Sequence, residues 1–104
     1  MLVRSVVGRL GGEEFAILLP ETDQAQAAVV AERIRESIAG QLLSVHDCQF
    51  KLSVSVGIAA ATASMSGTDA LLRAADSALY QAKSEGRNCL ACWSPPPAPR
   101  LAAE

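Results

Sequence analysis

The sequence predicts an α+β domain in which two helices pack on a mostly antiparallel sheet. Three observations lead to this prediction: alternating apolar and small residues at 50–60, two segments with apolar residues at helical spacing, and a Gly-Gly turn between two β-prone runs. In chain order the segments read strand, strand, helix, strand, helix, strand, and helices that cover one face of a sheet would bury its apolar side. With 104 residues, the chain has room for one domain.

The N-terminal part predicts a β-hairpin. Two β-prone runs, residues 3–10 and 15–19, flank the sequence Gly-Gly-Glu-Glu at 11–14. A glycine pair between two strand-like runs is typical of a tight hairpin turn. The tip of this hairpin would carry two adjacent carboxylates.

The next segment predicts a helix that ends near Gly40. Thr22 or Asp23 can cap its start, and glycine is a common stop signal. Its apolar face consists of residues spaced three or four apart, Ala27, Val30, Ile34 and Ile38. Charged residues at 32–36 cover the other side.

The second half predicts a strand, a helix and a final strand. Residues 50–60 alternate strictly, with one apolar face and one small face that permits a helix or a ligand to approach closely; simple helix packing is the plainer interpretation. A helix follows at about 69–85, and Gly86 suits the left-handed residue that ends it. Its predicted buried stripe is Leu71 or Leu72, Ala75, Leu79 and Ala82. A strand at 88–93 completes the domain, 1–94, and residues 95–104 form a Pro-rich tail.

Composition excludes several classes of protein. Half of the residues are apolar, which is too many for a disordered chain, but no apolar run approaches the about 18 residues of a membrane span. With no signal segment either, we expect a cytoplasmic chain without membrane contact. The net charge of −2 argues against nucleic-acid binding. Cys48, Cys89 and Cys92 are too few for a disulfide framework, and without a second ligand pair we expect reduced thiols and no zinc.

Two clusters could carry chemistry. The carboxylates of Glu13 and Glu14 could hold a hard cation such as Mg²⁺, and turn N–H groups could contact a phosphate. Lys83 and Arg87 lie four apart, so on a helix they would share one face and could clamp a polyphosphate. By spacing alone, a solvated hairpin tip and cations that complement a helix dipole are the better explanations of these residues.

Together, however, the motifs resemble the GGDEF domain of diguanylate cyclases. The resemblance consists of Gly-Gly-Glu-Glu-Phe at 11–15 after Arg9-Leu10, Ser-Val-Gly-Ile-Ala at 55–59, Ala-Asp-Ser-Ala-Leu-Tyr-Gln-Ala-Lys at 75–83, and Gly-Arg-Asn at 86–88. It implies a nucleotide-cyclase or ferredoxin-like fold. It also implies a bacterial signalling enzyme that condenses two GTP into cyclic di-GMP, with Mg²⁺ or Mn²⁺ as cofactor.

The resemblance also implies roles for individual residues. Glu13 matches the acidic residue that coordinates metal and helps to deprotonate the attacking hydroxyl, and Glu14 lies beside the same site. Gly11 and Gly12 match the turn that accommodates the nucleotide. The matching cations are an arginine near the phosphates, Arg9, and the pair that contacts the terminal phosphates, Lys83 and Arg87.

The chain also departs from the family pattern. The family's domain begins earlier, with a strand and helices that carry an aspartate of the metal site and the residues that recognise guanine. We therefore expect this chain alone to be weakly active or inactive, and the open strand edges predict a homodimer or higher self-association. The family's inhibitory product site would fall on Leu2 and Ser5, so we expect none. The alternatives are a non-catalytic GTP or cyclic di-GMP-binding module and a self-associating fragment.

Overall fold

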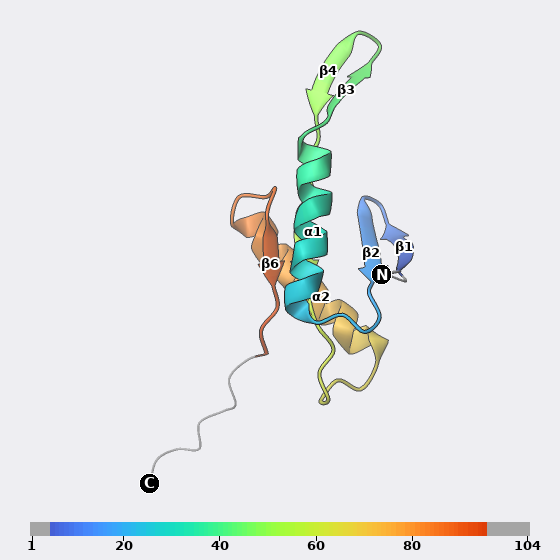
Figure 1. Ribbon diagram of the computed structural model, residues 1–104, viewed down its shortest axis with the longest axis vertical. Helices are drawn as coiled ribbons and strands as arrows, with labels where there is room; N and C mark the ends of the chain where they lie inside the picture. The colour runs from blue at the N-terminus through green and yellow to red at the C-terminus, as the bar shows by residue number, and fades with distance from the viewer. Residues whose placement is uncertain (1–4, 96–104) are drawn as a thin grey trace.

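The computed structural model describes residues 5–95 and has the α+β character that the sequence predicts (Figure 1). Two of its three strand pairs are antiparallel and one is parallel. Among residues 5–95, no helix combines the length and hydrophobicity that a bilayer crossing requires. The predicted tail lies outside the described residues except for Pro95. In chain order the elements are β1 (Val6–Gly11), β2 (Glu14–Leu18), α1 (Gln24–Ala39), β3 (Leu42–Val45), β4 (Cys48–Lys51), β5 (Val56–Ile58), α2 (Thr68–Ser84) and β6 (Leu90–Cys92).

Helix α1 begins and ends where the sequence predicts. The side chain of Asp23 accepts a hydrogen bond from the Gln26 N–H at 2.7 Å, and the Gln26 side chain accepts one from the Asp23 N–H at 3.1 Å. This reciprocal capping box satisfies two backbone donors that the first turn leaves without partners. At the other end, the N–H of Gly40 donates to the carbonyl of Glu36.

The centre of the molecule is the parallel pair β5–β6, with a helix on each face. Val56 pairs with Leu90 and Ile58 with Cys92. Both helices contact both strands. Gly57 of β5 faces α2, and in Figure 1 α2 passes behind β6 and α1. The expectation that the helices cover one face is therefore wrong. Both faces of β5 carry apolar or small residues, so each can receive a helix.

The predicted strand at 50–60 is divided in the structure. Residues 48–51 belong to β4 and residues 56–58 to β5, while residues 52–55 between them have no strand partner. The alternation is genuine, but a strand also needs a neighbouring backbone to pair with. Here β4 pairs with β3 and β5 pairs with β6, so one alternating run serves two separate sheets.

Helix α2 packs on the β5–β6 pair, and its buried side chains are all alanines. Its buried residues are Ala74, Ala78 and Ala82, and Ala82 is fully buried. Of the predicted stripe, Ala82 is buried, Leu71, Ala75 and Leu79 are half-buried, and Leu72 is exposed. The stripe misses the two other buried alanines. The backbones of α2 and β5 approach closely at Gly57, where an added Cβ would lie 2.2 Å from the carbonyl oxygen of Ala75.

The β1–β2 hairpin forms as predicted and is a sheet of its own. It pairs with no other strand of the described part of the chain. Six large apolar side chains on it are 45–65% exposed: Val6, Val7, Leu10, Phe15, Ile17 and Leu18.

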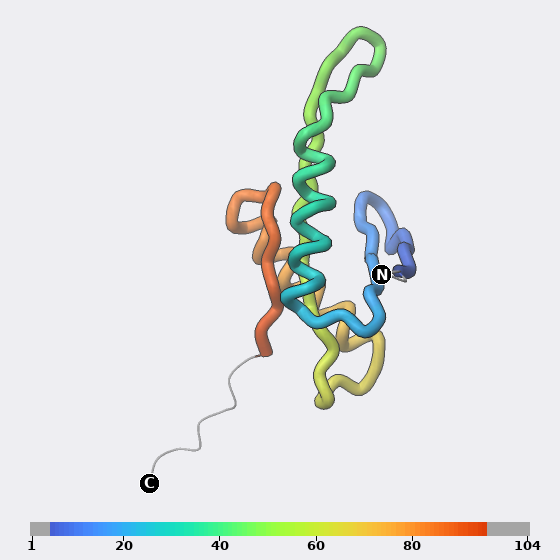
Figure 2. The backbone as a smooth tube through the Cα atoms, in the orientation of Figure 1, coloured from blue at the N-terminus to red at the C-terminus, as the bar shows by residue number. Residues whose placement is uncertain are grey.

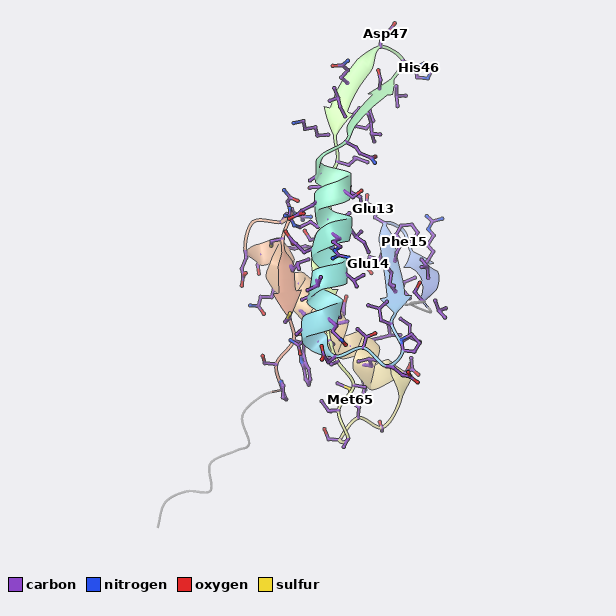
Figure 3. All side chains as sticks on the ribbon, viewed as in Figure 1. Glu13, Glu14, Phe15, His46, Asp47 and Met65 are labelled. Atoms are coloured by element: carbon purple, nitrogen blue, oxygen red, sulfur yellow. The ribbon has the colours of Figure 1, made fainter. Side chains whose placement is uncertain are left out.

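The β3–β4 hairpin is absent from the sequence prediction. It extends past the end of α1 (Figure 2) and turns at His46 and Asp47, which Figure 3 labels at its tip. Both turn residues have positive φ, 48° and 67°. A turn with two left-handed residues is usual for a two-residue hairpin loop, but it is normally signalled by Asn-Gly or Asp-Gly. His-Asp gives no such signal.

Candidate functional site

The acidic turn between β1 and β2 is built on two glycines. Gly11 and Gly12 have φ of 137° and 54°, and Gly11 pairs with Glu14 across the turn, which leaves Gly12 and Glu13 as the two loop residues. Residues with side chains rarely adopt φ near 137°. No atom lies within 4 Å of the position that a Cβ would take at either glycine. A ligand can therefore approach this backbone directly.

Arg9 fixes the shape of the same turn. Its Nε and Nη2 both donate to the carbonyl oxygen of Gly12, at 3.2 Å and 2.8 Å. The pairing register of the hairpin shifts between Arg9 and Gly11. One extra residue of β1, Leu10, therefore forms a bulge next to this contact. The resemblance places an arginine here near the phosphates; in this structure its guanidinium holds the turn.

The acidic turn and the end of α2 come together in space. Lys83 Nζ lies 3.9 Å from Glu14 Oε1, although the two residues are at opposite ends of the sequence. Their side chains are 39% and 47% exposed. An ion pair this open contributes only about 0–1 kcal/mol to stability. Both charges can therefore change partners at little cost when a charged ligand arrives.

Arg87 lies in a short loop after α2 whose backbone is left-handed. Gly86, Arg87 and Asn88 have φ of 116°, 63° and 48° in succession. The predicted role of Gly86 in ending the helix agrees with its positive φ, while the two residues that follow are not glycines. The N–H of Arg87 still reaches back to the carbonyl of Ala82 at 3.1 Å, which ties the loop to the helix end.

The acidic turn fits a divalent ion only in part. Glu13 and Glu14 are exposed neighbours (Figure 3), and among residues 5–95 no group of three His, Cys, Asp or Glu side chains is placed to hold a metal ion. Mg²⁺ commonly takes one or two carboxylates and completes its shell with water and substrate phosphate oxygens. This donor set therefore fits an ion that arrives with a polyphosphate, and does not fit a metal site made by the protein alone.

A hollow of about 440 Å³ lies elsewhere on the molecule. Ser77, Gln81, Cys92 and Trp93 are among its lining residues, and none of the acidic-turn or cationic residues lines it. The candidate site is thus an exposed junction between a hairpin tip and a helix end.

Comparison with known proteins identifies the fold that carries this junction. The family model described as the diguanylate cyclase GGDEF domain matches residues 2–89. The chain belongs to the GGDEF family. The acidic turn at 11–15 reads Gly-Gly-Glu-Glu-Phe, which differs only at Glu13 from the Gly-Gly-Asp-Glu-Phe sequence spelled by the family name.

Curated relatives and solved structures agree with this assignment. The chain is 40% identical over 84 residues to the response regulator PleD of Caulobacter vibrioides, covering 79% of this chain and 18% of PleD. It is 34% identical over 80 residues to diguanylate cyclase A of Treponema denticola, covering 77% and 22%. It therefore spans about a fifth of the length of these relatives.

The solved structures confirm the predicted cyclase-like fold. The GGDEF domain of DgcB from Caulobacter crescentus, in complex with c-di-GMP, superposes with a TM-score of 0.80 at 31% identity, covering 85% of this chain and 53% of that one. The active GGEEF domain of a diguanylate cyclase from Vibrio cholerae gives 0.79 at 30% identity, covering 89% and 58%. Just over half of each solved chain is matched.

Other predictions concern residues that the structure places less fully. Leu2 lies outside the described residues, and Ser5 is exposed just before β1, so the absence of the inhibitory site stays a prediction.

Sequence reasoning also missed Arg35, because the sequence predicts it on the solvent side of α1. Its guanidinium bonds the carboxylate of Glu32 and the side chain of Asn88. The three-residue spacing of Glu32 and Arg35 was the one available signal.

Proposed function

We propose that the junction of the acidic turn with the end of α2 is the phosphate- and metal-contacting part of a diguanylate cyclase site, with GTP as substrate and cyclic di-GMP as product. The single observation that carries the proposal is the 3.9 Å approach of Lys83 to Glu14. It joins two clusters that are separate in sequence. The carboxylates suit the metal ion of a metal-bound triphosphate, and the cationic side chains suit its negative phosphates.

The chemistry divides between the two clusters. Glu13 and Glu14 supply the carboxylate oxygens for a divalent ion, Mg²⁺ or Mn²⁺, and the proposal gives Glu13, an exposed residue of the turn, the task of helping to remove the proton of the attacking 3′-hydroxyl. When bound, the ion neutralises charge on the phosphoryl oxygens and lowers the pKa of a bound hydroxyl. Lys83 and Arg87 add positive charge for the terminal phosphates, and the open glycine turn lets the nucleotide reach the backbone.

Nucleotide binding tests the proposal directly. The chain is titrated with Mg²⁺ and GTP by calorimetry, and Lys83→Met is compared with Lys51→Met, a lysine on the exposed strand β4. One charge-assisted contact to a phosphate is worth about tenfold or more in affinity. We expect Lys83→Met to lose at least about that factor and Lys51→Met to match the wild type. Equal affinities in all three proteins would contradict the proposal.

Product formation separates the cyclase from its alternative. The chain is incubated with GTP and Mg²⁺ or Mn²⁺, and cyclic di-GMP is measured by chromatography and mass spectrometry, with Glu13→Gln as the inactive comparison. Product that disappears in Glu13→Gln supports catalysis by this chain. Binding without product instead supports a non-catalytic GTP-binding module.

We also propose that copies of the chain associate through the β1–β2 hairpin. This hairpin has unpaired strand edges within the described residues, and Val7 on it is 63% exposed. Such edges and apolar patches favour pairing with another chain. Light scattering tests this with Val7→Lys against Val29→Lys, a valine 54% exposed on α1. We expect only Val7→Lys to shift the mass toward the monomer, and a wild-type monomer at every concentration would exclude the association.

A further inference from the structure

The loop that carries Arg87 has a conformation that its own residues disfavour. Arg87 and Asn88 are consecutive non-glycine residues with φ of 63° and 48°, and residues 86–88 are all exposed. Side chains disfavour the left-handed region, although asparagine tolerates it better than arginine. Burial does not hold this loop in place, so specific hydrogen bonds must do so.

Those hydrogen bonds converge on Asn88. Its N–H donates to Ser55 Oγ at 3.2 Å, and its Oδ1 accepts from Arg35 Nη1 at 3.0 Å. The same Arg35 nitrogen lies 3.5 Å from the backbone oxygen of Asn88. Asn88 is therefore tied both to the chain just before β5 and to helix α1.

Arg35 is itself held in one orientation. Its Nε donates to Glu32 Oε2 at 2.9 Å, and its Nη2 donates to Oε1 of the same carboxylate. This is the two-pronged geometry in which a guanidinium is best fixed. The Arg35 side chain is only 18% exposed. A lysine would keep the charge but could not make the fork and the bond to Asn88 together.

We propose that Arg35 is a positioning residue for the phosphate-contacting pair Lys83 and Arg87. This inference rests on the proposed function of that pair. Arg87 is fixed on one side by its bond to the carbonyl of Ala82 and on the other by the tether at Asn88. Releasing the tether frees the left-handed backbone of Arg87 to relax, and the spacing of the two cations is lost.

The test measures affinity for Mg²⁺ with GTP, and separately with inorganic tripolyphosphate, on protein kept well below its unfolding temperature. The variants are Arg35→Gln, Asn88→Gly and the double variant. Arg33→Gln is the control, because it removes the same charge from an exposed position of α1 for which the described residues show no side-chain hydrogen bond. Asn88→Gly touches no core residue and keeps the left-handed backbone allowed, so it carries the same test if Arg35→Gln does not fold.

We expect each single variant to lose about threefold to tenfold in affinity for both ligands and the double variant to lose no more, because both changes remove the same bond between the Arg35 and Asn88 side chains. We also expect faster hydrogen exchange at the Arg87 amide in Arg35→Gln. Unchanged affinity in the single variants, a loss equal to that of Arg33→Gln, or additive losses would overturn the inference.

The parallel Lys83→Met measurement separates the two levels of the proposal. If Lys83→Met binds both ligands as the wild type does, the proposed function fails and this inference fails with it. If Lys83→Met loses affinity while Arg35→Gln does not, only the positioning role is overturned.

Discussion

Gly57 lies where strand β5 crosses helix α2, and the two backbones approach so closely that no side chain fits between them. A Cβ at this position would lie 2.2 Å from the Ala75 carbonyl oxygen, 2.2 Å from the Leu79 nitrogen and 2.7 Å from the Leu79 Cα. Ordinary contact begins at 3.4 Å, so the added methyl group falls about 1.2 Å short of the space it needs. All three obstructing atoms are backbone, so no side chain can move aside.

We therefore expect Gly57→Ala to displace α2 from the sheet. The helix makes its core contacts through Ala78 and Ala82, and short side chains cannot follow the strand when the helix moves away. Overpacking a core costs typically about 1–3 kcal/mol. Here the backbone of β5 meets the backbone of α2, so we expect the cost of this variant to lie at or above the upper end of that range. For a domain of this size, about 3 kcal/mol corresponds to a fall in melting temperature of roughly 12 °C or more.

Urea unfolding followed by the fluorescence of Trp93 measures this change. Trp93 is the only tryptophan of the chain and packs against the alanine core beside α2. Gly8→Ala is the matched control, because Gly8 is also a strand glycine but has nothing within 4 Å of its Cβ position. It should change the free energy of unfolding by less than about 1 kcal/mol. A Gly57→Ala protein as stable as Gly8→Ala would refute the packing argument.

Three further predictions concern stability. Asp23→Ala should cost about 1 kcal/mol in urea unfolding because it removes the N-cap of α1, and no loss would mean that the cap is redundant. Replacing His46 and Asp47 by Asn and Gly should stabilise the protein by roughly 0.4–1 kcal/mol, since both positions have positive φ; a destabilised variant would contradict the turn geometry. The hydrogen bond from Arg35 lowers the pKa of the Glu32 carboxyl below its ordinary value. A carboxyl whose pKa is lowered on folding stabilises the protein above its unfolded-state pKa, and this contribution is lost as the pH falls through the folded value. As the pH falls below the ordinary pKa of a glutamate carboxyl, the melting temperature of the wild type should thus fall more steeply than that of Glu32→Gln, and parallel curves would exclude this linkage.

The features that the sequence predicts well have local causes. The cap at Asp23, the stop at Gly40 and the apolar spacing between them define α1 without reference to any other part of the chain. The two glycines of the acidic turn likewise fix the β1–β2 hairpin. The turn needs positive φ at both positions, and glycine permits this without help from any distant residue.

The features that were missed or misplaced depend on partners far along the chain. The run at 50–60 looks like one strand, but β4 pairs with β3 and β5 pairs with β6, and no local pattern states where one partner ends and the other begins. Arg35 looked like a solvated residue because its partner Asn88 is remote in sequence. The β3–β4 turn, by contrast, is local, and it was missed because the residue types of His46 and Asp47 do not indicate the left-handed conformations that they adopt.

For the candidate site, the amino-acid order by itself determined which residues are available: a carboxylate pair on a glycine turn and two cations four apart at a helix end. Helical and turn geometry are short-range properties, so these pieces could be drawn from the sequence. Only the tertiary structure decided that Glu14 and Lys83 meet, that the backbone of α2 lies directly against Gly57, and that α1 reaches across to hold the loop of Arg87. Those contacts follow from how two helices settle on opposite faces of one short strand pair, and that arrangement is set by packing across the whole domain.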